Sequence, residues 1–292
     1  MSRLSSPIVI GGLGGSGTRI FAEVMQTLGV HIGVDLNPQL DNLWFTLLFK
    51  RRRAFRGMLR RRLSASAFDR CRLQLLTKAM TQSPTNPSTI EKICGWLAYR
   101  DVRSHGHDSE QRGVGPWADE RWRSMQVGSE PRSGAWGWKE PNSHIYLPLL
   151  LRQFPNLRYV HVLRHGLDMA FSSNVMQMKL WGPAFGIDEP ASKSLQPKSA
   201  FEFWLRANRR VMALGEKFPD QIILVRFEDL CRKPEQQIRA LASFASVEVA
   251  PAQLQQLLGR IVCPDPLHRY PGRDLTLFED AGSKLALFGY SV

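Results

Sequence analysis

Short apolar runs alternate along the chain with longer segments in which apolar residues recur every three or four positions. The runs 8–11, 158–164 and 221–226 are typical of strands buried on both faces of a parallel sheet. Residues 136–139 predict another strand, and 30–34 a further short one. The helical spacing predicts helices over residues 18–28, 41–49, 64–100 with a break at 83–88, 146–152, 200–217, 234–244, 251–260 and 280–288. Strands that alternate with helices predict an α/β fold with a central parallel sheet flanked by helices.

No internal repeat and no domain boundary interrupts this pattern. A chain of 292 residues can bury a substantial core, so we expect a single domain over 1–292. Helical and loop insertions are expected around 40–134 and 181–198. Within the first insertion, residues 101–134 are polar and lack periodicity, which is more typical of a functional lid than of a passive connector.

Composition narrows the class of protein. Apolar residues make up 43% of the chain and charged residues 22%, as in soluble globular proteins. No apolar run has the length of a membrane-spanning helix, and no signal peptide precedes the first strand, so a cytoplasmic location is expected. The cysteines are scattered without a Cys-x-x-Cys pair. We therefore expect reduced, mostly buried thiols and neither a disulfide framework nor a zinc site.

The net charge of +13 is concentrated in residues 50–62, which hold eight basic and no acidic side chains. Phe55, Met58 and Leu59 lie between the arginines, so the segment could form an amphipathic helix that contacts an anionic surface such as a membrane. A solvated basic helix face is the simpler interpretation. No zinc-finger spacing or aromatic RNA-binding motif is present, and we predict no nucleic-acid partner.

Two segments predict anion binding. Residues 7–19, Pro-Ile-Val-Ile-Gly-Gly-Leu-Gly-Gly-Ser-Gly-Thr-Arg, read as a strand, a glycine-rich turn and a helix start. Such a turn presents backbone N–H groups and the positive end of a helix to an anion. Arg164 ends a second strand, and Asp168 and Ser172 follow it at spacings of four and eight. Together the two segments suggest a ligand that carries phosphates at both ends.

The glycine-rich turn alone allows more than one interpretation. Gly12-x-Gly14-x-x-Gly17, with Asp35 further along, fits the dinucleotide fingerprint and would indicate an NAD(P)-linked oxidoreductase. Gly12-x-x-x-x-Gly17-Thr18 is similar to a nucleotide-triphosphate P-loop. The lysine of that motif is missing, which disfavours a kinase or NTPase.

A third interpretation uses most of the chain. Four short motifs follow one another along the chain. They are Gly15-Ser-Gly-Thr-Arg19, Trp138-Lys139-x-Pro141, Arg164-x-x-x-Asp168-x-x-x-Ser172 and, at residues 225–230, Val-Arg-Phe-Glu-Asp-Leu. Together they resemble the motifs of the sulfotransferase family, which transfers sulfonate from 3′-phosphoadenosine 5′-phosphosulfate (PAPS). Residues 154–164 and 281–290 are similar to that family's bacterial members. The resemblance implies a P-loop-like sulfotransferase fold, PAPS as co-substrate and no metal.

The resemblance also assigns binding residues. The 5′-phosphosulfate would lie against Gly15, Ser16, Gly17, Thr18 and Arg19, and the 3′-phosphate against Arg164 and Ser172. Arg273 and Arg269, in a late basic segment, are further candidates for the 3′-phosphate. The planar fork of arginine makes paired hydrogen bonds to phosphate. A dehydrogenase has no use for this second anion site, which favours the sulfotransferase interpretation.

Catalytic residues follow from the same resemblance. Lys139 matches the family's lysine that stabilises the leaving phosphate, and Arg19 is a second candidate. Many members carry a lysine or arginine where this chain has Gly15, so a non-catalytic nucleotide-binding or membrane-docking protein stays an alternative. For the general base we rank Asp41 and Asp35 ahead of His144, with Glu140 also considered. Asp168 is expected to orient the turn that carries Arg164. The acceptor is expected to be a hydroxyl or amine. A carbohydrate or small metabolite is one candidate, and lipid, small phenol and peptide hydroxyls are equally compatible with the sequence.

Overall fold

The structure is a computed structural model that describes residues 6–50, 66–81, 88–104, 134–264 and 267–292. Almost all of the basic segment 50–62 and most of the expected lid 101–134 lie outside the described residues. The predictions made for those two segments therefore stay predictions.

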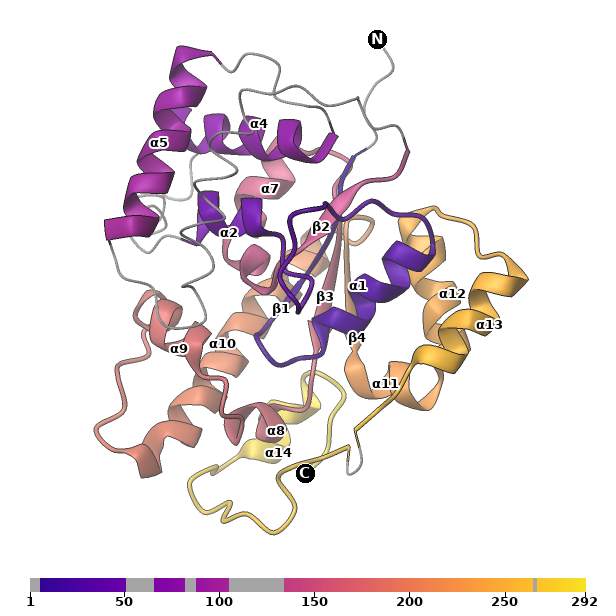
Figure 1. Ribbon diagram of the computed structural model, residues 1–292. Coiled ribbons are helices and arrows are strands. Elements are labelled where there is room, and N and C mark those ends of the chain that lie inside the picture. Colours follow the sequence, from indigo (N-terminus) through magenta and orange to yellow (C-terminus); the bar gives the residue numbers. More distant parts are fainter. Residues whose placement is uncertain (1–5, 51–65, 82–87, 105–133, 265–266) are drawn as a thin grey trace. The chain divides into compact units, whose positions relative to one another are not determined.

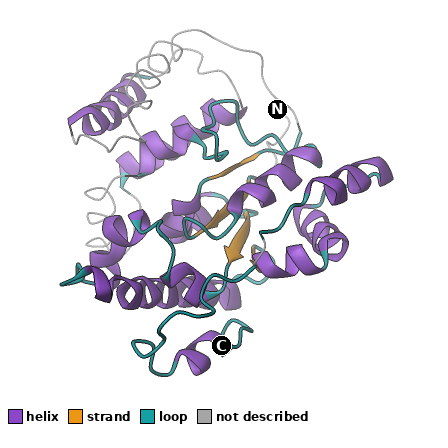
Figure 2. Cartoon of the chain, turned by 60° about the horizontal axis from the view of Figure 1, so that its bottom comes forward, coloured by secondary structure: helices purple, strands orange, loops and turns teal. Residues whose placement is uncertain are grey.

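Four strands form one sheet in the order β2-β1-β3-β4. They are β1 (Ile8–Gly12), β2 (Gly137–Lys139), β3 (Arg158–Leu163) and β4 (Ile222–Arg226). β3 and β4 run parallel, with Val162 opposite Val225. Every residue of β1 is buried, as the continuous apolar run predicted. Helices make up most of the remaining described chain (Figure 2), which confirms the α/β class with a central parallel sheet.

The chain divides into two compact units. The first comprises Met1–Val9, Gly29–Glu140 and Tyr146–Leu157. Its helices are α2 (Leu43–Phe49), α4 (Ala67–Thr81), α5 (Thr89–Ser104) and α7 (Leu147–Gln153). The helices α2, α4 and α5 pack on one another (Figure 1). Aromatic rings fill part of the core beside α2, where the ring centroid of Phe45 lies 4.9 Å from that of Phe49 and 5.9 Å from that of Trp138.

The second unit comprises Ile10–Leu28, Pro141–Ile145 and Arg158–Val292. The long helix α10 packs on α8 and β4, and α12 packs on α13, beside which it is drawn in Figure 1. The helices of this unit are α1 (Thr18–Thr27), α8 (Gly166–Ala170), α9 (Met176–Trp181), α10 (Gln196–Lys217), α11 (Phe227–Arg232), α12 (Pro234–Ala245), α13 (Pro251–Arg260) and α14 (Ala281–Ala286). Short 3₁₀ segments span Pro141–Tyr146, Gly182–Phe185 and Lys193–Leu195.

Two of the differences from the expected elements have a visible local cause. Helix α2 begins at Leu43 because the side chain of Asn42 accepts a hydrogen bond from the Phe45 amide and so caps the helix. The strand expected over 30–34 is absent from the described sheet; instead His31 forms a single bridge with Trp136. One bridge satisfies too few backbone groups to build a strand from that segment.

The expectation of reduced cysteines is wrong for one pair. Cys231 and Cys263 form a disulfide, with their Cα atoms 5.7 Å apart. They lie 32 residues apart in the chain, and no local spacing pattern indicates that the fold brings them together. Cys71 and Cys94 are free and buried, as expected. Burial, followed by the neighbouring Cys71, raises the pKa of Cys94 to about 12, so this thiol is unreactive at neutral pH.

A helix that spans a membrane must be long and apolar along most of its length. Among the helices that the structure describes, none is both long enough and apolar enough to cross a membrane.

Candidate functional site

The glycine-rich turn between β1 and α1 depends on its glycines. Gly15 and Gly17 have φ angles of +96° and +91°, which L side chains rarely adopt. A Cβ atom on Gly17 would lie 2.4 Å from Cδ2 of Phe227, too close for any side chain. The ring of Phe227 thus packs directly under the turn where α1 begins.

The N-terminus of α1 has main-chain N–H groups that can bind an anion. No side chain caps the helix, and its first turn has no acidic residue. The first amides of any helix lack an intrahelical acceptor and lie at the positive end of its dipole. Ser16 is 1% exposed, and its hydroxyl has no hydrogen-bond partner within the described part of the chain. A buried hydroxyl without a partner is costly, so this turn fits an anionic ligand.

Arg19 is placed differently from its neighbours in the turn. Its Nε atom lies 3.7 Å from a carboxylate oxygen of Glu23, and its side chain is 61% exposed. The guanidinium is therefore directed along the outer face of α1, toward a carboxylate. The main-chain N–H of Arg19 belongs to the first turn of α1, whereas its side chain is engaged elsewhere.

The fold brings the second predicted segment against this turn. Arg164 follows β3, is 5% exposed, and its Nη1 donates a hydrogen bond to the carbonyl oxygen of Gly15 (3.3 Å). The hydroxyl of Ser172 lies 3.6 Å from where a Cβ of Gly15 would be. The indole of Trp204 donates to the carbonyl oxygen of Arg164 (3.0 Å) and fixes its backbone. Arg164, Ser172 and the glycine-rich turn thus form one site.

The guanidinium of Arg164 lies in a strongly charged environment. It lies 5.1 Å from the ring centroid of Phe227, and its Nε is 3.8 Å from Asp168 without a hydrogen bond. Burial, followed by the nearby positive charge of Arg269, lowers the pKa of Arg164, while Asp168 and Glu228 raise it. A bound anion would offset the unfavourable interaction of these two positive charges.

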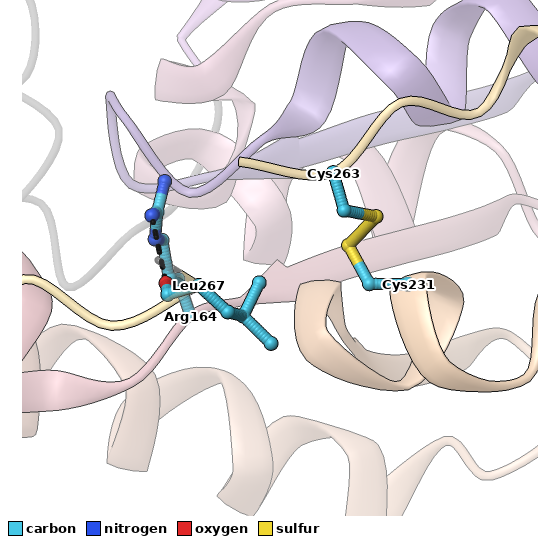
Figure 3. Close-up of a disulfide and its surroundings, with 4 residues drawn as sticks. All are labelled: Arg164, Cys231, Cys263 and Leu267. Atoms are coloured by element: carbon cyan, nitrogen blue, oxygen red, sulfur yellow. Dashed lines mark hydrogen bonds between the residues drawn. A yellow bond between two sulfur atoms is a disulfide. The ribbon is translucent and has the colours of Figure 1, made fainter. Parts of the chain in front are cut away.

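A segment near the C-terminus, residues 267–270, crosses this site. Asp168 Oδ1 accepts hydrogen bonds from the amides of Arg269 (2.5 Å) and Tyr270 (3.2 Å). The second oxygen of Asp168 lies 3.2 Å from Nδ1 of His268. Arg164 Nη2 donates to the carbonyl oxygen of Leu267 (3.5 Å; Figure 3). Asp168 therefore holds residues 268–270 as well as the turn of Arg164, which is a wider role than the sequence suggested.

Arg273 lies in the same region. Its guanidinium lies 5.7 Å from the ring centroid of Phe171, the residue before Ser172. Arg164, Ser172, Arg269 and Arg273 all belong to the second unit, and their role at a 3′-phosphate stays a prediction.

Sequence reasoning took Glu228 as structural but did not identify its partners, and it missed Gln177. Glu228 accepts a hydrogen bond from the His165 amide and another from the Tyr290 hydroxyl, both 2.8 Å long. Burial and Glu228 raise the pKa of Tyr290 above its ordinary value. The amide of Gln177 donates to the carbonyl oxygen of Gly12 (3.4 Å). The run Arg-Phe-Glu-Asp after a buried strand was the available signal, but its partners lie far away in sequence.

Asp168, Glu228 and His268 place possible metal ligands within 4.8 Å of one another. All four carboxylate oxygens of the two acids already interact with backbone amides, a hydroxyl or the histidine ring. The cluster therefore fits a hydrogen-bonded support for the turns around it. The absence of a metal stays a prediction.

The first unit contains a buried ion pair. Lys139, at the end of β2, is 3% exposed at its side chain, and its Nζ lies 2.5 Å from Asp41 Oδ1 and 2.8 Å from the carbonyl oxygen of Gln39. The side chain of Asp41 is 22% exposed. Its other carboxylate oxygen, Oδ2, accepts a hydrogen bond from the side-chain Nδ2 of Asn37 (3.0 Å). Two of the predicted catalytic residues, Lys139 and Asp41, are thus directly paired.

The other candidate bases have different surroundings. Asp35 accepts a hydrogen bond from the indole of Trp44 (2.9 Å). His144, in the second unit, is fully buried, and its pKa lies well below the ordinary value, first because of burial and then because of His161 and Arg210. Glu140 is also buried. Asp35 and Asp41 are each partly exposed, whereas His144 and Glu140 are buried, so the two aspartates are the more accessible candidates.

The chain matches a known protein family in its sequence. A sequence model described as "Sulfotransferase family" matches residues 7–251. The chain is 24% identical over 123 residues to a Caenorhabditis briggsae protein named "Putative protein-tyrosine sulfotransferase". That match covers 41% of this chain and 41% of the relative, so it spans less than half of the relative's length.

Two solved structures are also similar to the chain. One is the sulfotransferase domain from the Synechococcus PCC 7002 olefin synthase, with 16% identity, coverage of 99% of this chain and 96% of that chain, and a TM-score of 0.48. The other is sulfotransferase STF1 from Mycobacterium tuberculosis H37Rv, with 15% identity, coverage of 97% and 77%, and a TM-score of 0.45.

Proposed function

Because the chain belongs to the sulfotransferase family, we propose that it transfers a sulfonate group from PAPS to a hydroxyl or amine acceptor, such as a carbohydrate or small metabolite. One observation carries the proposal. Arg164 and Ser172 lie against the glycine-rich turn, so that a helix N-terminus and a buried arginine face the same site. The amides of the turn and the guanidinium are two distinct sets of donors, which suits a ligand that carries two anionic groups.

The residues of the second unit fit PAPS at both of its ends. Amides of the turn and the unpaired hydroxyl of Ser16 suit the 5′-phosphosulfate. Three arginines suit the 3′-phosphate: Arg164, Arg269 and Arg273. The Nε atom of Arg164 makes no hydrogen bond to the described residues and can therefore donate one to a ligand. PAPS itself supplies the activated sulfonate and a phosphate leaving group.

The Lys139–Asp41 pair offers the two functions that the transfer requires. An ammonium has three N–H donors, and Lys139 directs two of them to Asp41 and Gln39. We assign the third to the negative charge that develops on the leaving phosphate. Asp41 would accept the proton of the acceptor group as the new bond from oxygen or nitrogen to sulfur forms and the bond from sulfur to the phosphate oxygen breaks.

Calorimetric titration tests the nucleotide specificity. We expect adenosine 3′,5′-bisphosphate to bind more tightly than 5′-AMP and NADH, with an affinity that falls as salt concentration rises, because the contacts are largely ionic. Tight binding of NADH would instead support the oxidoreductase alternative. No binding of the bisphosphate would refute the proposal.

Activity is tested separately, with labelled PAPS and a panel of hydroxyl and amine acceptors. Gly15 stands where many family members have a basic residue, and its φ of +96° disfavours any side chain there. Binding of the bisphosphate without transfer to any acceptor would favour the non-catalytic alternative.

A further inference from the structure

The disulfide between Cys231 and Cys263 joins two segments that both reach the nucleotide site. Cys231 lies on α11, four residues after Phe227, and Cys263 lies four residues before Leu267. Figure 3 shows the disulfide together with the hydrogen bond from Arg164 to Leu267. All of these residues belong to the second unit.

The side of the disulfide that carries α11 is firmly packed. Phe227 is buried against Gly17 and under the guanidinium of Arg164. Glu228 is buried and bonded to the backbone of His165. Cys231 is thus attached to a fixed part of the site.

The other side of the disulfide leads to a segment without regular secondary structure. Residues 267–270 belong to no helix or strand, and Arg269 is exposed. Hydrogen bonds join these residues to Asp168 and Arg164, and the carbonyl oxygen of Tyr270 accepts another from the main-chain N–H of Arg273. The ring of Tyr270 stacks on that of His165 with centroids 4.6 Å apart. A segment without regular secondary structure gains further order from a covalent attachment nearby in the chain.

We propose that the Cys231–Cys263 disulfide is a positioning element of the nucleotide site. It holds residues 267–270 against Arg164 and Asp168, so that Arg269 adds its charge to that of Arg164 at the 3′-phosphate. This inference rests on the proposed function. Opening the disulfide should therefore weaken recognition of the 3′-phosphate while the glycine-rich turn keeps its affinity for the 5′ end.

The disulfide is open to chemical test because both of its cysteines are only partly buried, whereas Cys71 and Cys94 are fully buried. Dithiothreitol donates two electrons and two protons to the S–S bond, which gives two thiols, and is itself oxidised to a cyclic disulfide. The oxidised and reduced forms of the same protein can then be compared.

The experiment measures the affinity for adenosine 3′,5′-bisphosphate and for 5′-AMP, with and without dithiothreitol. 5′-AMP lacks the 3′-phosphate and is the internal control. We expect reduction to weaken bisphosphate binding about tenfold, as for the loss of one charge-assisted contact. Binding of 5′-AMP should change less than twofold. The C231S/C263S double variant should match the reduced protein and ignore dithiothreitol, whereas Cys71→Ala should respond like the wild type.

The variant Arg269→Ala distinguishes a positioning role of the disulfide from a purely structural one. The quantity to measure is the preference for the bisphosphate over 5′-AMP. In the oxidised protein this substitution should reproduce the loss of 3′-phosphate preference, and in the reduced protein it should add little. An unchanged preference after reduction would overturn the inference. An equal loss for both ligands with a lower melting temperature would also overturn it, because the disulfide would then only stabilise the fold. Failure of the oxidised wild type to bind the bisphosphate would instead refute the proposed function itself.

Discussion

The guanidinium of Arg164 donates a hydrogen bond to the main-chain carbonyl of Gly15, which lies 149 residues earlier in the chain. Its other terminal nitrogen, Nη2, bonds to the carbonyl of Leu267, 103 residues later. One buried side chain thus connects the glycine-rich turn, the end of β3 and the segment 267–270. Any change at Arg164 should affect binding at both ends of the nucleotide.

Replacing Arg164 by alanine should weaken binding of adenosine 3′,5′-bisphosphate by about 10- to 100-fold, because hydrogen bonds to charged groups are worth about 1.5–3 kcal/mol. Arg164→Lys keeps the charge but loses the planar fork, so its effect should be intermediate. Titration calorimetry measures both. The matched control is Arg239→Ala, which removes the same charge from an exposed pair with Glu235 on α12. An equal loss in the control would mean that net charge, and not the site, determines binding.

Gly17→Ala should destabilise the protein and impair nucleotide binding together. The added Cβ would lie 2.4 Å from Phe227, at a φ of +91°. Overpacking and the unfavourable φ together should lower the free energy of unfolding by about 2–4 kcal/mol. Urea denaturation measures this change. Gly259→Ala is the control, because Gly259 lies in α13 with no atom within 4 Å of an added Cβ, and this substitution should be neutral or slightly stabilising.

The sequence predicted the parts of this site that are local. The strand before the glycine-rich turn, the helix after it and the spacing from Arg164 to Ser172 are short-range patterns, and each was placed within a few residues. The two anion-binding motifs suggested one shared ligand, and the resemblance to a family supported this. The contact itself depends on β1 and β3 lying side by side in the sheet.

The supporting contacts could not be predicted because they join distant segments. Glu228 bonds to His165 at a separation of 63 residues, and Asp168 bonds to Arg269 at a separation of 101. The disulfide is a similar case, because two single cysteines carry no signal of their own. A buried carboxylate bonded to backbone amides looks the same in sequence as a solvated one, and only the fold distinguishes the two.

Stability should fall as the solution is acidified from pH 6.5 to about 4. Burial lowers the pKa of His161 from 6.5 to about 4, and it also lowers that of His144. Between these values the unfolded chain binds a proton at His161 and the folded chain does not. Unfolding is therefore favoured as pH falls, by about 3 kcal/mol for His161 alone. Urea denaturation between pH 4 and pH 7.5 measures the slope, and His161→Gln should flatten it. An identical slope in this variant would contradict the assignment.

Lys139→Ala should abolish most turnover and leave nucleotide binding largely intact. The loss of one donor to a developing negative charge costs about 10²- to 10³-fold in kcat. The affinity for the bisphosphate should stay within a few fold, because the substitution leaves the proposed binding residues Arg164, Ser172 and the glycine-rich turn unchanged and removes a donor that is assigned to charge that develops during the transfer. Single-turnover transfer from labelled PAPS and calorimetry separate the two quantities. Lys284→Ala, which breaks a partly exposed pair with Glu202, is the control and should retain activity. Normal transfer by Lys139→Ala would refute the role assigned to this lysine.

Asp41→Asn and Asp35→Asn should separate the two carboxylate candidates for the base. Asparagine at 41 can still accept a hydrogen bond from Lys139 but cannot take a proton, so kcat should fall by about 10²- to 10⁴-fold. Asparagine at 35 can still accept from the indole of Trp44, so that variant should keep its fold and most of its activity. Comparing kcat with KM distinguishes a lost base from a weakened acceptor site. A larger loss of kcat at position 35 than at position 41 would transfer the proposed role to Asp35.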